Sequence, residues 1–151
     1  MKKLTILLLM CFPVFSQEYK VPPEVIKSLI EADPQPIINF NDDGSLGLVL
    51  NSDGYQSIDD LAKDELRVAG TRLDPVRYTS SRMRYYKSFS LLETKTGEEI
   101  EVEYPENGKF SFFQWSPNEQ KIAFTNTTNS GVELWVIDVN SRKSSKAVSY
   151  T

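Results

Sequence analysis

Six basic side chains between positions 67 and 87 form the densest group of functional side chains in the sequence. The group consists of Arg67, Arg72, Arg77, Arg82, Arg84 and Lys87, with Tyr78, Tyr85 and Tyr86 interleaved. Guanidinium groups can bind carboxylates through two parallel hydrogen bonds, so the group could recognise an acidic ligand. It could equally be a loop whose charges are solvated or ion-paired. A nucleic-acid surface is disfavoured, because the formal net charge of the chain is -4.

The sequence contains no histidine. A Ser-His-Asp triad, a Cys-His pair or a histidine-containing zinc site therefore cannot be assembled within the chain. No G-x-S-x-G elbow, Walker loop or dinucleotide-binding glycine motif occurs either. We expect no catalytic residue, no metal and no cofactor in this chain.

One short segment resembles the start of a calcium-binding loop. Asn39, Asn41, Asp43 and Gly44 have the right spacing, but the first ligand is not an aspartate, and Leu50 stands where a bidentate glutamate belongs. We interpret the segment as a plain turn. The two tryptophans, at positions 115 and 135, are expected to lie in a core.

Alternation of side chains indicates that the elements around the arginines are strands. The clearest cycle runs from Phe110 to Val139, where three strands and two turns follow one another. The predicted strands there are Phe110–Trp115, Lys121–Asn126 and Glu133–Val139, with Lys146–Tyr150 as a fourth. Both faces of the first of these are largely apolar, so we expect it to be covered on both sides.

An earlier copy of the same pattern predicts a first sheet. Its strands are Ile37–Phe40, Leu46–Leu50, Tyr85–Glu93 and Glu99–Tyr104. Two consecutive four-stranded antiparallel sheets are typical of β-propeller blades. We therefore predict an all-β fold with minor helix, an incomplete propeller whose blade 1 spans about 37–104 and blade 2 about 110–150, within a region 37–151.

Helical patterns are confined to two places. Tyr19–Asp33, within an N-terminal segment 17–36, predicts a short amphipathic helix that starts after Pro22-Pro23. Residues 51–84 form an insertion in blade 1. Within it Ile58–Ala69 predicts a short helix or turn that Gly70 ends, and Thr71–Arg84 predicts an ordered loop.

The first sixteen residues have the pattern of a secretory signal peptide, with Lys2 and Lys3 before an apolar run. We expect cleavage near Ser16-Gln17, hence an exported protein, periplasmic or extracellular, whose mature chain has no membrane span. A retained anchor helix, or lipid anchoring through Cys11, stays open. Cleavage would also remove the only cysteine and lower the 17 basic residues to 15 against 21 acidic ones.

The chain resembles the amino-terminal portion of exported prolyl-oligopeptidase-family serine peptidases, on the glutamyl endopeptidase branch. The motifs that carry the resemblance are Tyr19–Ile26, Glu65–Pro75 (ELRVAGTRLDP), Ser81–Met83, Trp115–Pro117, Lys121–Phe124 and Leu134–Val136. The resemblance implies a propeller that precedes an α/β-hydrolase domain carrying the Ser, Asp and His. That domain is absent here, so no catalytic residue carries over, and we interpret the chain as a fragment or truncated product.

The resemblance implies a role in substrate selection. The propeller would gate the active site of the missing hydrolase domain for peptide substrates, the insertion would project toward that domain, and Arg82 or Arg84 would help to select acidic peptides. The alternative is a non-enzymatic periplasmic propeller that binds a protein or glycan partner. Two blades alone would leave unpaired edges and an exposed apolar face, which predicts aggregation or assembly.

Overall fold

The computed structural model describes residues 20–150, and their side chains as far as residue 148. The predicted signal peptide, 1–16, lies outside the described residues. The chain divides into two units, Met1–Glu31 and Ala32–Thr151. No helix among the described residues is long and apolar enough to cross a membrane.

The first unit contains the predicted amphipathic helix, α1 (Glu24–Glu31). It starts directly after Pro22-Pro23, where the Pro23 carbonyl accepts hydrogen bonds from the amides of Ile26 and Lys27. It ends shortly before Pro34, whose ring disfavours helical geometry in the preceding residue. Within this unit none of the residues of α1 is buried, and the apolar stripe of the helix is exposed.

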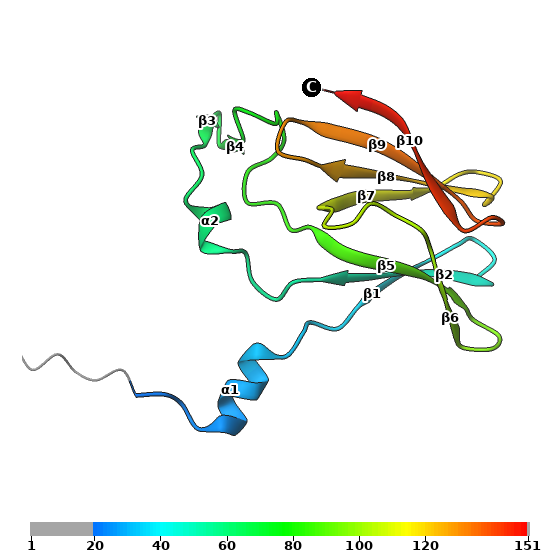
Figure 1. Cartoon of the computed structure of the whole chain (residues 1–151), viewed down its shortest axis with the longest axis horizontal. Helices are drawn as coiled ribbons and strands as arrows, with labels where there is room; N and C mark the ends of the chain where they lie inside the picture. The colour runs from blue at the N-terminus through cyan, green and yellow to red at the C-terminus, as the bar shows by residue number, and fades with distance from the viewer. Residues whose placement is uncertain (1–19, 151) are drawn as a thin grey trace, which may run out of the picture. The chain divides into compact units, whose positions relative to one another are not determined.

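The second unit is built around two four-stranded antiparallel arrays (Figure 1). The first sheet contains β1 (Ile37–Phe40), β2 (Leu46–Ser52), β5 (Tyr86–Glu93) and β6 (Glu98–Glu101). The second sheet contains β7 (Phe110–Trp115), β8 (Lys121–Thr127), β9 (Val132–Asp138) and β10 (Lys143–Tyr150). The two are joined by one pair, Tyr86 with Phe110, and the whole does not close on itself within the described residues. The predicted fold class, an all-β incomplete propeller with minor helix, is confirmed.

The core lies between the two sheets. The first sheet contributes Leu48, Leu50, Phe89 and Leu91, and the second contributes Phe110, Ile122, Phe124 and Ile137. The ring of Phe89 lies at its centre, with centroids 5.2 Å from Phe110, 5.1 Å from Phe113 and 5.1 Å from Phe124, each in an edge-on arrangement. Trp115 and Trp135 pack against this cluster, as expected.

A polar clasp joins the sheets at the end where β1 turns into β2. Glu119, in the β7–β8 turn, accepts hydrogen bonds from Asn41 Nδ2 (2.9 Å) and from the amide of Asp42 (2.8 Å). Asn41 is 8% exposed, and its other contacts hold Asp43 and Ser45 within the predicted turn. Glu119 has φ +57°, a conformation that an L-residue adopts at a cost, and the clasp offsets that cost.

Strand β7 is not covered on both sides, so that prediction is wrong. The register slips between Ser111 and Gln114, which is a β-bulge, and Phe112 within it has φ +54° and is 71% exposed. The alternation therefore breaks at this point. Phe113 turns its ring into the core and Phe112 turns away from it.

Strand β6 is shorter than its pattern predicts, because the chain leaves β5 after Glu101. Val102 and Tyr104 turn into the core as the chain crosses toward the second sheet. The amide of Glu103 then donates to the carbonyl of Arg142 (3.0 Å), and the amide of Ser144 donates to the carbonyl of Glu103 (3.1 Å). This crossing also explains why β10 begins at Lys143, earlier than predicted.

The insertion contains a hairpin that sequence reasoning missed. Helix α2 is only Ile58–Leu61, capped by the Ser57 hydroxyl, and β3 (Leu66–Val68) pairs with β4 (Thr71–Leu73). The prediction of helix up to position 69 is wrong beyond α2. Ala69 and Gly70 have φ +48° and +84°, the two-residue turn that suits the twist of a hairpin. The segment after β4, predicted as a loop, folds back so that Ser80 bridges Leu73.

We expect Phe89→Ala to lower the free energy of unfolding by about 3–5 kcal/mol, because the ring it removes from β5 of the first sheet contacts three aromatic side chains of the second sheet. Tyr78→Ala is a matched control, since Tyr78 is 87% exposed, and should change stability by less than about 0.5 kcal/mol. Urea unfolding followed by tryptophan fluorescence measures both. Equal effects of the two substitutions would contradict a shared core.

Candidate functional site

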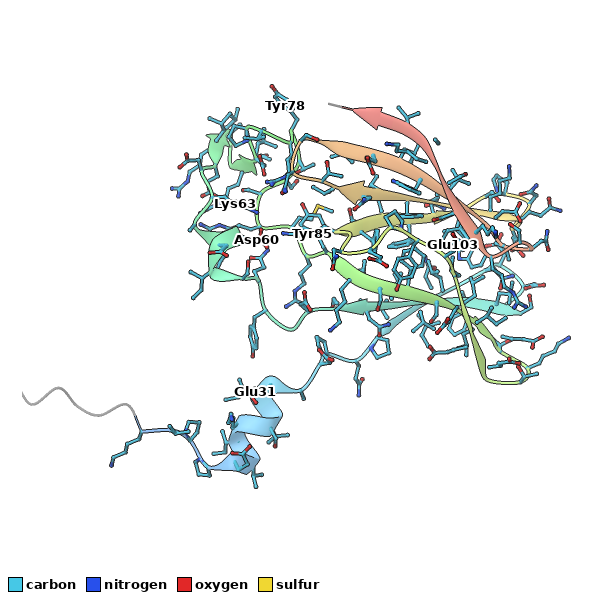
Figure 2. The ribbon with its side chains drawn as sticks, in the orientation of Figure 1. Glu31, Asp60, Lys63, Tyr78, Tyr85 and Glu103 are labelled. Carbon is cyan, nitrogen blue, oxygen red and sulfur yellow. The ribbon has the colours of Figure 1, made fainter. Side chains whose placement is uncertain are left out.

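The insertion lies across one end of both sheets (Figure 1), where it contacts the second sheet through two polar links. Arg77 Nε donates to the carbonyl of Thr128, in the β8–β9 turn, at 2.7 Å. Lys109 Nζ, directly before β7, donates to both carboxylate oxygens of Asp60 at 2.8 and 2.9 Å. Figure 2 shows Asp60 with Lys63 and Tyr85 at this end of the molecule. A segment that connects two strands of the first sheet is thereby fixed to the second sheet.

Asp60 is held as a carboxylate by its neighbours. Hydrogen bonds from Lys109 and then from Lys63 lower the pKa of Asp60 far below its ordinary value, against a smaller opposing effect of burial. Lys109 also lies over the ring of Tyr85, with its Nζ 5.6 Å from the ring centroid. This group ties α2 to the residues directly before β5 and β7.

Glu65 is the centre of the insertion's charge network. Its side chain is 11% exposed and accepts hydrogen bonds from Ser81 Oγ (3.0 Å) and Arg67 Nε (3.2 Å) and from Arg72. Arg82 Nε lies 3.3 Å from the same carboxylate. Desolvation acts to raise the pKa of Glu65, but the hydrogen bonds from Ser81 and Arg67 and the charges of Arg72 and Arg82 outweigh it, so the pKa is lowered.

Two further basic residues of the cluster have acidic partners. Arg77 pairs with Asp74 at 2.6 Å. Lys87 Nζ lies 3.1 Å from Asp33 and 3.4 Å from Asp53, and the hydrogen bond that it donates to Asp33 is the largest cause of the raised pKa of Lys87. Five of the six basic residues are therefore ion-paired within the chain. Their partners are Glu65, Asp74, Asp33 and Asp53.

Arg84 differs from the rest of the cluster. Its side chain is exposed, and among residues 20–148 it has no acidic partner within ion-pair distance. It borders a pocket of about 160 Å³ whose walls include Tyr55, Met83 and Lys109. Gln56 donates to the carbonyl of Met83 at 3.2 Å and fixes one wall. Arg84 therefore keeps a guanidinium group available beside a concave surface.

Arg82 and Arg84 both lie beside a second, shallower pocket of about 360 Å³. Tyr55, Gln56 and Leu61 line it with them. The structure thus brings the two sequence-predicted residues to one surface, but in different states, since Arg82 is held by Glu65 and Arg84 is not. The surface can bind a carboxylate. Among the described residues, no group of three His, Cys, Asp or Glu side chains is arranged to hold a metal ion.

Sequence reasoning missed the residues that build this surface, namely Asp60, Glu65 and Lys109. The one available signal was the position of Glu65 within the same short run as Arg67 and Arg72. Lys109 had no such signal, because 49 residues separate it from Asp60.

We expect Glu65→Gln to loosen the insertion and leave both sheets intact, because the amide cannot hold three guanidinium groups. Hydrogen exchange read by mass spectrometry should show faster exchange in residues 65–84 and no change in β2, β5 and β8. Glu98→Gln is the matched control, since Glu98 is exposed and makes no ion pair among the described residues. Unchanged exchange in residues 65–84 of Glu65→Gln would refute the role of this carboxylate.

The ion pairs and hydrogen bonds around Glu65 should also be lost at low pH. The pKa of Glu65 is lower in the folded state, so its stabilising effect is complete above its unfolded pKa of about 4.3 and is lost as the pH falls through the folded value. Protection of residues 65–84 in the wild-type chain should therefore fall below about pH 4. The difference between the wild-type chain and Glu65→Gln should shrink over the same range, and a constant difference would contradict the assignment.

Comparisons with known proteins point to peptidases. No family model and no solved structure matches the chain. The chain is 29% identical over 134 residues to a protein of Oryza sativa subsp. japonica called probable glutamyl endopeptidase, chloroplastic. The matched region covers 82% of this chain. A protein of the same name from Arabidopsis thaliana is 30% identical over 131 residues, 80% of this chain. The chain spans 14% of the length of each of these relatives, so it is similar to one part of a peptidase-related protein.

Proposed function

We propose that the chain is the non-catalytic, N-terminal propeller region of an exported serine peptidase of the glutamyl endopeptidase type, in which it gates access and helps to select peptide substrates. The observation that carries the proposal is the similarity to two proteins named glutamyl endopeptidase along 80–82% of the chain. Catalysis would belong to a hydrolase domain outside this sequence, because the sequence has no histidine.

The insertion is the part of the chain best suited to contact such a domain. Within residues 55–78 it exposes an unusual number of large apolar side chains, which are Tyr55, Ile58, Leu61, Leu66, Val68, Val76 and Tyr78. Clusters of exposed apolar residues mark surfaces that contact other proteins. The polar links to Thr128 and Lys109 hold this surface in a fixed position on the two sheets.

Arg84 supplies the means of selecting acidic peptides. An ion pair with a ligand carboxylate gains most when the guanidinium is not already paired, and Arg84 meets that condition among residues 20–148. Arg82 would first have to leave Glu65. In this proposal Arg84 contacts the acidic side chain of the peptide, and Arg82 contributes to the positive potential around it.

The proposed function includes export of the protein from the cytoplasm. The pattern of residues 1–16 would direct the chain across a membrane, with cleavage near Ser16-Gln17, and the mature region would act outside the cytoplasm. A domain without cysteine in its mature region suits that setting only if packing alone stabilises it, as the shared core of the two sheets does.

In a full-length peptidase that carries this chain, we expect Arg84→Ala to lower kcat/KM for cleavage after Glu about fivefold, which is about 1 kcal/mol for one partly exposed charge pair. Cleavage of the matching Gln peptide should not change. The effect of Arg82→Ala should have the same sign and be smaller. Steady-state kinetics with the Glu and Gln peptides measure the ratio.

Arg67→Ala is the matched control. Arg67 is 69% exposed and contacts the same Glu65 as Arg82, but it does not line either pocket beside Arg84. Its removal should leave the preference for Glu over Gln unchanged. If both Arg82→Ala and Arg84→Ala also leave that preference unchanged, the selection role fails.

A further inference from the structure

The side chain of Arg82 borders two pockets that differ in charge. A small inner pocket of about 40 Å³ contains Arg82 and several acidic residues in its lining, which are Asp60, Asp64, Glu65 and Asp74. The shallow pocket of about 360 Å³, which Arg82 shares with Arg84, has no acidic residue among the described residues that line it. The pairing of Arg82 with Glu65, at 3.3 Å, therefore leaves the shallow pocket with positive charge and no acid to balance it.

The two oxygens of the Glu65 carboxylate have different partners. Oε1 accepts hydrogen bonds from Arg67 and Arg72, which lie on the paired strands β3 and β4. Oε2 accepts a hydrogen bond from Ser81 at 3.0 Å and lies 3.3 Å from Arg82 Nε, the longest of these four contacts. If Arg82 leaves, each oxygen keeps a hydrogen bond, so the carboxylate is not left unsatisfied.

Hydrogen bonds hold the backbone on both sides of Arg82. The amide of Ser81 donates to the carbonyl of Arg72 at 3.0 Å, and the carbonyl of Met83 accepts from Gln56 at 3.2 Å. Arg82 itself has φ +59°, a conformation that an L-residue adopts at a cost and that recurs at ligand clamps and switches. Because its side chain is 44% exposed, the guanidinium can move while the backbone stays in place.

Two acidic residues line the neighbouring pocket of about 160 Å³ with Arg84, and both have basic partners. Asp53 lies 3.4 Å from Lys87. Asp60 accepts two hydrogen bonds from Lys109, at 2.8 and 2.9 Å. The charges of both carboxylates are thus balanced without Arg84.

We propose that Glu65 competes with the carboxylate of an acidic peptide for Arg82, so that a peptide bound at Arg84 causes Arg82 to leave Glu65 and to bind the same peptide carboxylate. This inference rests on the proposed function, since it takes the acidic side chain of a peptide as the ligand. A carboxylate has enough acceptor sites for two guanidinium groups, and both ion pairs are charge-assisted hydrogen bonds. A Gln peptide lacks the charge and should leave Arg82 on Glu65.

The competition makes the selection of acidic peptides stricter. An exposed ion pair is weak, so the pair of Arg82 with Glu65 can be exchanged for a pair with a ligand carboxylate. A neutral acceptor, such as a peptide carbonyl, offers less than the carboxylate that Arg82 already has. Glu65 therefore acts against neutral ligands, which widens the difference in affinity between acidic and neutral peptides.

Nuclear magnetic resonance of the arginine Nε–Hε groups tests the exchange on the full chain. The probe is a capped peptide with one Glu, and the same peptide with Gln is its control. The signals of Arg82 and Arg84 should both shift with the Glu peptide and follow one binding curve. In Arg84→Ala, the Arg82 signal should keep its ligand-free position at the peptide concentration that saturates the wild-type chain.

The same titration separates this inference from the proposed function. If the Arg84 signal shifts and saturates with the Glu peptide while the Arg82 signal stays in place, the exchange is overturned and the role of Arg84 stands. If neither signal moves, both fail. Equal shifts of the Arg82 signal with the Glu and Gln peptides would also overturn the exchange.

A double-mutant cycle measures the competition. Isothermal titration calorimetry gives the Kd of the Glu peptide for the wild-type chain, Glu65→Gln, Arg82→Ala and the double variant. Glu65→Gln also loosens the insertion, but it does so in both backgrounds. The ratio of the wild-type Kd to the Glu65→Gln Kd should be about threefold larger than the same ratio with Arg82→Ala in both chains, which is the size of one exposed ion pair.

Arg67→Ala provides the matched control background. Arg67 contacts the other oxygen of Glu65 and lines neither the inner nor the shallow pocket. Glu65→Gln should change the Kd there by the same factor as in the wild-type chain, and circular dichroism verifies the fold of each variant. An effect of Glu65→Gln that is the same with and without Arg82 would contradict the competition.

Discussion

The two sheets are held together by side-chain packing around the ring of Phe89. Neither sheet has an extensive core of its own, because the buried apolar side chains of both sheets, apart from Val49 of β2, lie on the faces that meet. Only one backbone pair joins the sheets directly, so side-chain packing sets their relative position. Polar contacts at both ends, the Glu119 clasp and the insertion's links to Thr128 and Lys109, then restrict rotation about this contact.

This arrangement explains how the insertion keeps a defined shape. Residues 53–85 contain two short strands and one turn of helix, too little to bury a core. They keep their shape because Glu65 gathers Arg67, Arg72 and Arg82, and because Asp60 meets Lys109 on the far sheet. Five of the six basic residues of the cluster therefore form ion pairs that hold the surface together. Arg84 is the basic residue of the cluster that makes no ion pair among residues 20–148.

The strands were predictable because they follow a simple alternation, and all eight strands of the two sheets were located from it to within a few residues. The β3–β4 hairpin was not, because its turn depends on Ala69 at positive φ, a conformation that alanine rarely adopts and that local pattern does not indicate. The bulge at Phe112 was not predicted either, because it also depends on a residue at positive φ. At the site, residue type identified the arginines, but the contact of Lys109 with Asp60 exists only once the sheets have packed.

We propose that Arg84 binds the acidic side chains of peptides, and nuclear magnetic resonance of the arginine side chains can observe this binding at the residue itself. The chain would be titrated with two capped peptides that differ only in Glu or Gln at one position. The Nε–Hε signal of Arg84 should shift and saturate with the Glu peptide, while that of Arg67 stays in place. Equal shifts with both peptides, or an Arg84 signal that does not move, would contradict the claim.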